Sequence, residues 1–200
     1  MLDGGIGQEI FRRSGKPAHP LWSAKVMMEA PEIVKEVYKD FLRAGSRILT
    51  INTYTCTPTR LRRDGQYEWF VPLQKQACTL ARQAVKELSL SAADVKVAGC
   101  LPPLVGSYVQ DERSFDVLKS EYQEIVAVQS PRVDMFLIET ISTLKEARAA
   151  VEAALESGKD VMLGFTLSDT DRGKLRSGES FTSALDVVGA YPLTAILLNC

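Results

Sequence analysis

Short apolar runs alternate with longer amphipathic stretches along the whole chain of 200 residues. Several of the apolar runs are nearly continuous, which is typical of parallel strands covered on both faces rather than of half-solvated antiparallel strands. The opening segment MLDGG could add one short strand before them. The pattern otherwise predicts strands over residues 46–52, 95–101, 134–140, 160–166 and 194–200.

Amphipathic helices are predicted between the strands. In the first of them, apolar residues recur at helical spacing, Pro31 stands near the start and Gly45 follows the end, where proline and glycine are expected. Thr143 and Glu146, three residues apart, have the spacing of a capping box at the start of another helix. The predicted helices cover residues 30–45, 71–88, 114–129, 143–158 and 180–190.

This order repeats a strand and a helix about six times without a linker or a change of composition, so residues 1–200 are expected to form a single domain. A doubly wound sheet would need a glycine-rich phosphate turn, but DGGIG lacks the third glycine and no acidic residue ends the second strand. The sequence therefore predicts a (β/α)8 TIM barrel, of which about six β-α units are present.

Composition narrows the range of partners. The chain has 24 Lys and Arg against 25 Asp and Glu, and this balance does not suggest nucleic acid or an anionic membrane as a partner. The N-terminus has no secretory pattern, and the cysteines form no CxxC pair, so reduced thiols and a cytoplasmic location are expected. The sequence is compatible with a homo-oligomer and does not determine the oligomeric state.

Polar residues gather where the predicted strands end, and reactive groups of such folds lie at the carboxyl ends of parallel strands. Glu139 ends an otherwise apolar run, where a buried carboxylate needs a partner. The partner could be a ligand amine or, as the structural alternative, a lysine or arginine of a nearby loop. The other residues at strand ends are Asp3, Gly4, Asn52, Thr53, Tyr54, Cys100 and Cys200.

Three further candidates stay open at this point. Trp22 could line a pocket or merely cover the barrel mouth. The single histidine, His19, is expected on a solvated loop. Cys56, Cys100 and Cys200 lie near strand ends, and together their thiolates could bind Zn²⁺.

Taken together, the strand-end motifs resemble the homocysteine S-methyltransferase family over essentially the whole chain. The resemblance rests on short motifs in a fixed order, each of which is weak alone. They are LDGGIGQEI, LWSA, INTYTCT, VAGCLPPLVGSY, IETISTLKEA, FTLSD, LRSGESF and LLNC.

The resemblance implies zinc-dependent methyl transfer from an activated, S-methylmethionine-like donor to the thiol of homocysteine, which forms methionine. Zn²⁺ would bind three cysteines, of which Cys200 is the first, with two further cysteine ligands expected beyond residue 200. Asp3, Gly4 and Glu139 would bind the amino acid substrate. The segment with Asn52, Thr53 and Tyr54 would line the mouth, where Tyr54 or Trp22 could face the cationic donor.

The sequence departs from the family pattern at four pocket positions: Gln8, Cys100, Pro102 and Ser142 replace the usual threonine, serine, glycine and proline. The last strands of the barrel and the paired cysteines are also missing, so the chain is expected to be C-terminally incomplete. The alternative is a degenerate or non-catalytic relative that binds a small amino acid or thiol without turnover.

Overall fold

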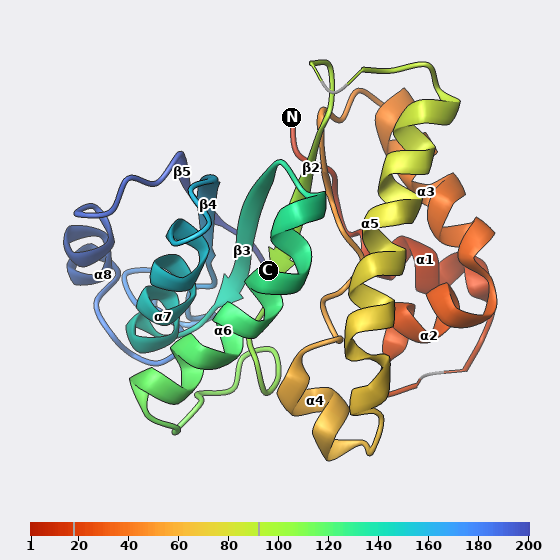
Figure 1. The fold of residues 1–200 in the computed structure, drawn as a ribbon. Helices are drawn as coiled ribbons and strands as arrows, with labels where there is room; N and C mark the ends of the chain where they lie inside the picture. The colour runs from red at the N-terminus through yellow and green to blue at the C-terminus, as the bar shows by residue number, and fades with distance from the viewer. Residues whose placement is uncertain (18, 92) are drawn as a thin grey trace.

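The computed structural model describes residues 1–17, 19–91 and 93–200. Helices and strands alternate from β1 onward, after three helices at the N-terminus (Figure 1). The strands are β1 (Ile48–Thr50), β2 (Lys96–Leu101), β3 (Met135–Ile141), β4 (Asp160–Phe165) and β5 (Ala195–Leu198). The α-helices are α1 (Ile6–Ser14), α2 (Trp22–Glu29), α3 (Pro31–Arg43), α4 (Pro58–Arg63), α5 (Phe70–Glu87), α6 (Phe115–Gln129), α7 (Leu144–Leu155) and α8 (Phe181–Val188), with short 3₁₀ turns η1 (Tyr67–Trp69) and η2 (Ser130–Arg132).

The strands form one parallel sheet in the order β1-β2-β3-β4-β5, so each strand pairs with the next along the chain. In Figure 1, α5 and α6 lie beside the sheet, with α7 and α8 at its far end. This sequential parallel order is that of a barrel wall rather than of a doubly wound sheet, whose strand order reverses at a switch point. The barrel prediction is confirmed, and the described residues form part of such a barrel.

The expected opening strand is reduced to a single bridge. Leu2 pairs in parallel with Ile48, and the Asp3 amide donates a hydrogen bond of 3.0 Å to the Ile48 carbonyl. The two glycines that follow turn the chain into α1 immediately, so the segment is too short for a ladder. It still lies at the β1 edge of the sheet and directs Asp3 toward the interior.

Helix α7 begins at the residue that the capping signal predicts, but only half of the expected capping box forms. The Thr143 hydroxyl accepts a hydrogen bond from the Glu146 amide at 3.1 Å, which caps α7. The reciprocal half of the capping box does not form, because the Glu146 carboxylate instead accepts from the Leu104 amide at 3.0 Å and from the Tyr122 hydroxyl at 3.1 Å. Glu146 is thus committed to the segment that follows β2.

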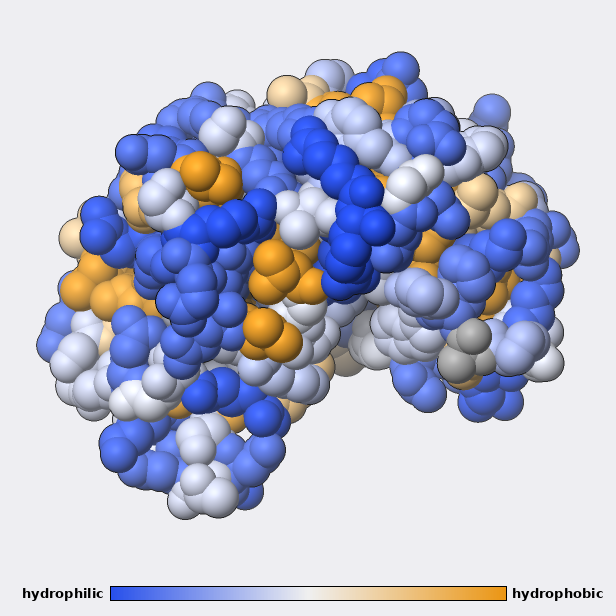
Figure 2. All heavy atoms as spheres, turned by 90° about the horizontal axis from the view of Figure 1, so that it is seen from below, coloured by the Kyte–Doolittle hydropathy of each residue, from blue (hydrophilic) through white to orange (hydrophobic). Residues whose placement is uncertain are grey.

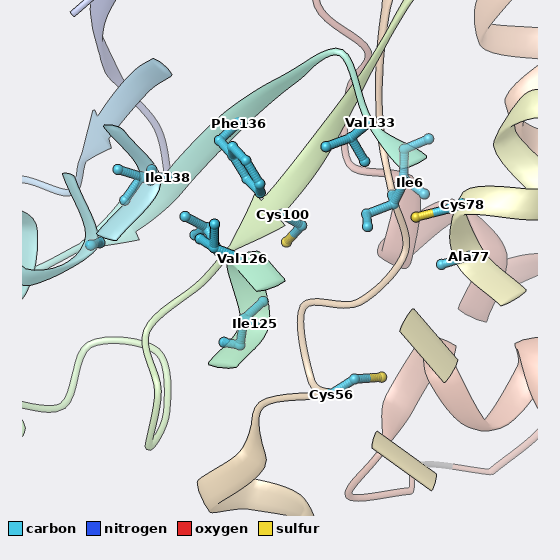
Figure 3. Packing of buried hydrophobic residues seen from close by; sticks show 14 of the residues in the cluster. Ile6, Cys56, Ala77, Cys78, Cys100, Ile125, Val126, Val133, Phe136 and Ile138 are labelled. Carbon is cyan, nitrogen blue, oxygen red and sulfur yellow. The ribbon is translucent and has the colours of Figure 1, made fainter. Parts of the chain in front are cut away.

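Alternate residues of the strands face two different hydrophobic clusters. Phe136 and Ile138 of β3 pack outward against helix residues such as Val126 (Figure 3). Ala98, Met135 and Leu137 face the other way and form a small cluster on the concave side. The side chain of Glu139, two residues after Leu137, therefore points to the concave side. No helix in the described part of the chain is long and apolar enough to cross a membrane.

Candidate active site

A cavity of about 650 Å³ opens on the concave side, at the carboxyl ends of the strands. Seen from below, the outline of the molecule is indented between two halves, and hydrophobic residues show among hydrophilic ones near its centre (Figure 2). The lining comes from segments far apart in the sequence: Leu2–Gln8, Trp22, Thr50–Asn52, Tyr54, Ser107, Tyr108, Leu137, Glu139, Thr140, Gly164 and Leu197–Cys200.

A bulge in β3 shapes the centre of this cavity. The register between β3 and β4 shifts between Ile138 and Ile141, and Thr140 has a φ of 60°, which is unusual for a β-branched residue. The Thr140 amide donates to the Asn199 side chain at 3.0 Å, and the Asn199 side chain donates back to the Thr140 hydroxyl at 2.9 Å. These bonds stabilise the bulge and tie it to the end of β5.

Two carboxylates face the cavity. Asp3 accepts from the Thr50 amide at 2.5 Å and from the Thr50 hydroxyl at 2.9 Å. Burial raises the pKa of Asp3 to about 7, and the charge of Glu139 contributes to the rise. Burial also raises the pKa of Glu139, whose carboxylate accepts from the Cys100 thiol at 3.0 Å.

The described part of the chain gives these carboxylates no cationic partner. No lysine or arginine lines the cavity, and the ion pairs of the described residues include neither Asp3 nor Glu139. Among the described residues Glu139 pairs with no loop lysine or arginine; the thiol of Cys100 takes that place. Two uncompensated carboxylates beside apolar walls favour a cationic ligand group.

Cys200 is exposed and lies at the end of the cavity lining. Its sulfur is 3.8 Å from the Thr140 hydroxyl and 3.7 Å from the Asn199 side-chain nitrogen, and its carbonyl accepts from the Thr166 hydroxyl at 2.9 Å. The bulge of β3 therefore helps to position the only cysteine thiol that lines this cavity among the described residues.

The hypothesis of a zinc site built from Cys56, Cys100 and Cys200 is wrong for the structure described. No three His, Cys, Asp or Glu residues of the described chain are grouped closely enough to hold a metal ion. Cys56 and Cys100 are buried among hydrophobic residues on separate segments, as is Cys78 on α5 (Figure 3). Burial raises the pKa of Cys56 to about 12, so its thiol stays protonated. Nearness to a strand end did not reveal which way each side chain points.

Asn52 and Thr53 play different parts. Asn52 lines the cavity, and its side chain is bonded to the hydroxyl of Ser23 at 2.6 Å and to the Ser23 carbonyl at 3.2 Å, which joins the end of β1 to α2. Thr53 is buried and is not in the lining; its hydroxyl accepts from Gln129 at 3.5 Å. Thr53 therefore supports the wall from behind.

Aromatic residues line the rest of the cavity. Trp22 begins α2 with a φ of 43°, and its ring lies where a Cβ on Gly7 would be 2.5 Å away, so Gly7 makes room for it. The Tyr54 hydroxyl is 2.7 Å from the Ser107 hydroxyl. His19 lies on a loop outside the cavity lining, and its Nδ1 accepts from the Leu21 amide at 3.0 Å.

Ser107, Tyr108, Thr140 and Asn199 are polar lining residues that were not assigned a role from the sequence. Thr140 and Asn199 carry a sequence signal, since each stands at a strand end. Ser107 and Tyr108 belong to the motif VAGCLPPLVGSY, but the motif does not show that they line the cavity, because they lie well past the end of β2 and return to the cavity only through the course of the loop.

Comparison with known proteins agrees with the family resemblance of the sequence motifs. The family model for homocysteine S-methyltransferase matches residues 1–200. The chain belongs to the homocysteine S-methyltransferase family. It is 27% identical to the homocysteine S-methyltransferase of Escherichia coli strain K12, over all of this chain and 68% of that protein. It is 29% identical to betaine–homocysteine S-methyltransferase 1 of Rattus norvegicus over 80% of this chain and 38% of that protein.

A solved structure supports the family assignment and the fold. The metallated form of homocysteine methyltransferase MmuM from Escherichia coli superposes with a TM-score of 0.87 at 27% identity, over all of this chain and 73% of that one. The predictions of family, enzyme class and fold are thus confirmed at the level of a homocysteine methyltransferase family.

The donor set shows how far the described residues fit a metal ion. A thiol at the cavity wall is a suitable soft ligand, and Cys200 provides one. A structural or catalytic zinc site takes about three or four protein ligands. The described residues bring no such set of ligands together. Cys200 therefore fits as one ligand, and a three-thiolate site would need two ligands from outside these residues.

Proposed function

We propose that this protein transfers a methyl group to the thiol of L-homocysteine and forms methionine, with the ammonium group of the substrate bound at Asp3 and Glu139. The observation that carries this proposal is the pair of cavity carboxylates without a cationic partner among the described residues. An α-ammonium group would complete this site through charge-assisted hydrogen bonds. The family relatives named for homocysteine support the same substrate.

The positions of the two carboxylates and of Cys200 support a binding place for each end of the substrate. Asp3 and Glu139 would hold the ammonium group, and Cys200 marks the wall where the substrate sulfur would lie. A zinc ion bound there through Cys200 and two further cysteines would stabilise the substrate thiolate. The bulge at Thr140 joins these two parts of the site, because Glu139 precedes it and Cys200 contacts it.

The reaction is a substitution at carbon. The lone pair of the homocysteine thiolate forms the new S–C bond, the bond between the methyl carbon and the donor heteroatom breaks, and its electron pair stays with the donor. A sulfonium donor such as S-methylmethionine leaves as a neutral thioether. The aromatic residues of the lining favour such a cationic donor over a neutral one.

The test is the affinity of the full-length protein for L-homocysteine, measured by calorimetry together with methionine formation. Glu139→Gln keeps the size of the side chain but removes its charge, so we expect homocysteine binding to weaken about 10- to 100-fold. Glu32→Gln, an exposed change in the first turn of α3, is the control. Equal binding by wild type and Glu139→Gln would contradict the assignment of the ammonium site.

Methionine formation separates the enzyme from the alternative. A protein that binds homocysteine but forms no methionine with any sulfonium or quaternary ammonium donor would be the non-catalytic relative. Binding and turnover are measured on one preparation of the full-length protein, so that the two results can be compared directly.

A further inference from the structure

The segment that follows β2, residues 102–113, is held by buried groups at both ends and is exposed in its middle. Pro102, Pro103 and Leu104 are buried, as is Asp111. Between them, Tyr108 is 47% exposed and Val109 is 52% exposed. The segment therefore crosses the cavity mouth between two buried attachments.

The first attachment holds the backbone at three successive residues. The Tyr122 hydroxyl donates to the Pro102 carbonyl at 3.0 Å, and Arg60 donates to the Pro103 carbonyl at 2.8 Å. The Leu104 amide donates to the Glu146 carboxylate at 3.0 Å. Helices α4, α6 and α7 thus each contribute one side chain to this attachment.

This attachment is costly to build. Arg60 is 7% exposed and Glu146 is fully buried, yet Arg60 Nε and Glu146 Oε2 have no hydrogen-bond partner. Burial raises the pKa of Glu146 to about 7 and lowers the pKa of Arg60. Buried charges with incomplete pairing destabilise a fold, so their presence indicates that the exact course of this segment matters.

The second attachment is an ionic cluster. Arg113 donates to Asp111 at 2.5 Å and to Glu121 at 2.7 Å, and Glu121 also accepts from the Thr59 amide at 2.7 Å. Lys145 donates to the Arg113 carbonyl at 2.8 Å. The end of the segment is therefore held to both α4 and α6.

The exposed middle of the segment contributes two residues to the cavity lining, Ser107 and Tyr108. Tyr108 has a φ of 64°, a left-handed conformation that costs energy for an aromatic residue. Arg176, from the segment after β4, lies over its ring at 4.2 Å from the centroid. Arg176 also donates to the Thr166 hydroxyl at 3.2 Å, and that hydroxyl donates to the Cys200 carbonyl at 2.9 Å, so Tyr108 lies on the Cys200 side of the cavity.

We infer that Tyr108 is the specificity-determining residue for the methyl donor, and that Glu146 and Arg60 are positioning residues that hold its segment at the cavity mouth. This inference rests on the proposed function. With the homocysteine ammonium group at the two carboxylates and its sulfur near Cys200, the donor must approach that sulfur from the solvent side, in line with the bond that forms. Tyr108 is the strained, exposed aromatic residue on that side, and its ring suits a compact cation.

The experiment titrates the full-length protein with S-methylmethionine and, separately, with L-homocysteine. Tyr108→Ala is expected to weaken S-methylmethionine binding about tenfold and homocysteine binding by less than about twofold. Tyr108→Phe, which keeps the ring, should restore donor binding to within about threefold of wild type. Val109→Ala, at the exposed neighbour outside the lining, is the matched control.

The positioning role has its own readout. Glu146→Ala leaves the Leu104 amide unpaired and the Tyr122 hydroxyl with only the Pro102 carbonyl as partner, so donor binding should weaken while homocysteine binding is kept. Glu146→Gln retains an acceptor oxygen and should recover most of the donor affinity. Circular dichroism checks that each variant is folded, and an unfolded Glu146→Ala leaves the decision to the Tyr108 variants.

Two results would overturn the inference: donor binding unchanged in Tyr108→Ala, or donor and homocysteine binding weakened equally. A wild type that does not bind S-methylmethionine would overturn it as well. Failure of the proposed function gives a different result. A protein that binds both ligands but forms no methionine would contradict the proposed reaction, and the titrations would still decide the role of Tyr108.

Discussion

Asp3 shows how one residue combines a structural and a ligand-binding task. Its carboxylate takes two hydrogen bonds from Thr50 and so attaches the N-terminal segment to the end of β1. Burial nevertheless raises its pKa to about 7. The side chain is therefore partly protonated near neutral pH until a cation enters the cavity.

This predicts a pH dependence of ligand binding. Methionine, which carries the same ammonium group but no thiol, should bind up to about tenfold more weakly at pH 6 than at pH 8, because Asp3 is protonated below about 7. Calorimetry across this range measures the effect, and Asp3→Asn should reduce it. Binding that strengthens as the pH falls would contradict the assignment.

The same pKa has the opposite consequence for stability. Because the folded-state pKa of Asp3 lies above its ordinary value of 3.8, its contribution to stability is fully present below that value and is lost as the pH rises through about 7. Unfolding of wild type and Asp3→Asn by urea, compared at pH 5 and pH 8, should therefore show wild type losing stability relative to the variant as the pH rises.

Gly7 also shapes the site, because it has no side chain. A Cβ at this position would lie 2.5 Å and 2.8 Å from two ring carbons of Trp22. Gly7→Ala should displace the ring, lower the free energy of unfolding by about 1–3 kcal/mol and weaken S-methylmethionine binding.

Gly5→Ala is the control for this prediction, since the nearest atom to a Cβ there is the Gln8 Cβ at 3.7 Å. Urea unfolding and calorimetry of both variants give the comparison. If Gly7→Ala were as stable as Gly5→Ala and bound the donor like wild type, Trp22 would have no fixed place in the cavity wall.

At the scale of elements, the meeting of β3, β4 and β5 fixes the centre of the site. Gly164 of β4 faces Asn199, and a Cβ there would lie 3.0 Å from the Asn199 side-chain oxygen and 3.3 Å from the Ile138 carbonyl. Since that oxygen accepts from the Thr140 amide, β4 must carry a glycine for the bulge to be stabilised.

Gly164→Ala should therefore disturb the bulge and lower the free energy of unfolding by about 1–3 kcal/mol. Gly106→Ala is the comparison, because its Cβ would meet only Val109 at 3.7 Å. Urea unfolding of the two variants measures the difference. Equal stability of both would show that the Asn199 side chain has room to move and does not hold Thr140.

The strands were the elements that sequence patterns predicted best. Four of the five apolar runs contain an observed strand, and β3 extends one residue past its run, because a parallel strand covered on both faces needs apolar residues throughout. The opening strand shrank to the Leu2–Ile48 bridge, since a chain that turns at Gly4 and Gly5 has no length for a ladder. Helices α1, α2 and α4 were missed. The short sequence WSAKVMME of α2 has little amphipathic pattern.

The site could be predicted only in part. Asp3, Gly4, Trp22, Asn52, Tyr54, Glu139 and Cys200 all line the cavity, since strand ends meet at one edge of a parallel sheet. Thr53 and the buried thiols of Cys56 and Cys100 do not, because side-chain direction at a strand end depends on local twist and bulges. The place of Tyr108 in the cavity lining could not be predicted, because the course of its loop is set by tertiary contacts such as those of Arg60 and Glu146.

At the scale of the whole molecule, the described chain forms one side of a barrel. Its cavity lies between the N-terminal and the C-terminal segments of the chain. Residues near the N-terminus (Leu2–Gln8) and near the C-terminus (Leu197–Cys200) line the same space. In Figure 1 the C-terminal residue lies near the middle of the molecule, beside the sheet. The cavity therefore depends on the complete parallel order of the strands rather than on any one of them.

The central claim is that this cavity transfers a methyl group to homocysteine at a metal site that includes Cys200. The most direct test is methionine formation from L-homocysteine and S-methylmethionine by the full-length protein, measured with its zinc content. Wild type should form methionine and contain zinc, and Cys200→Ala should lose zinc and more than about 100-fold of the rate. Cys78→Ala, which changes a buried thiol on α5, should keep both. A Cys200→Ala protein as active and as zinc-loaded as wild type would contradict the account.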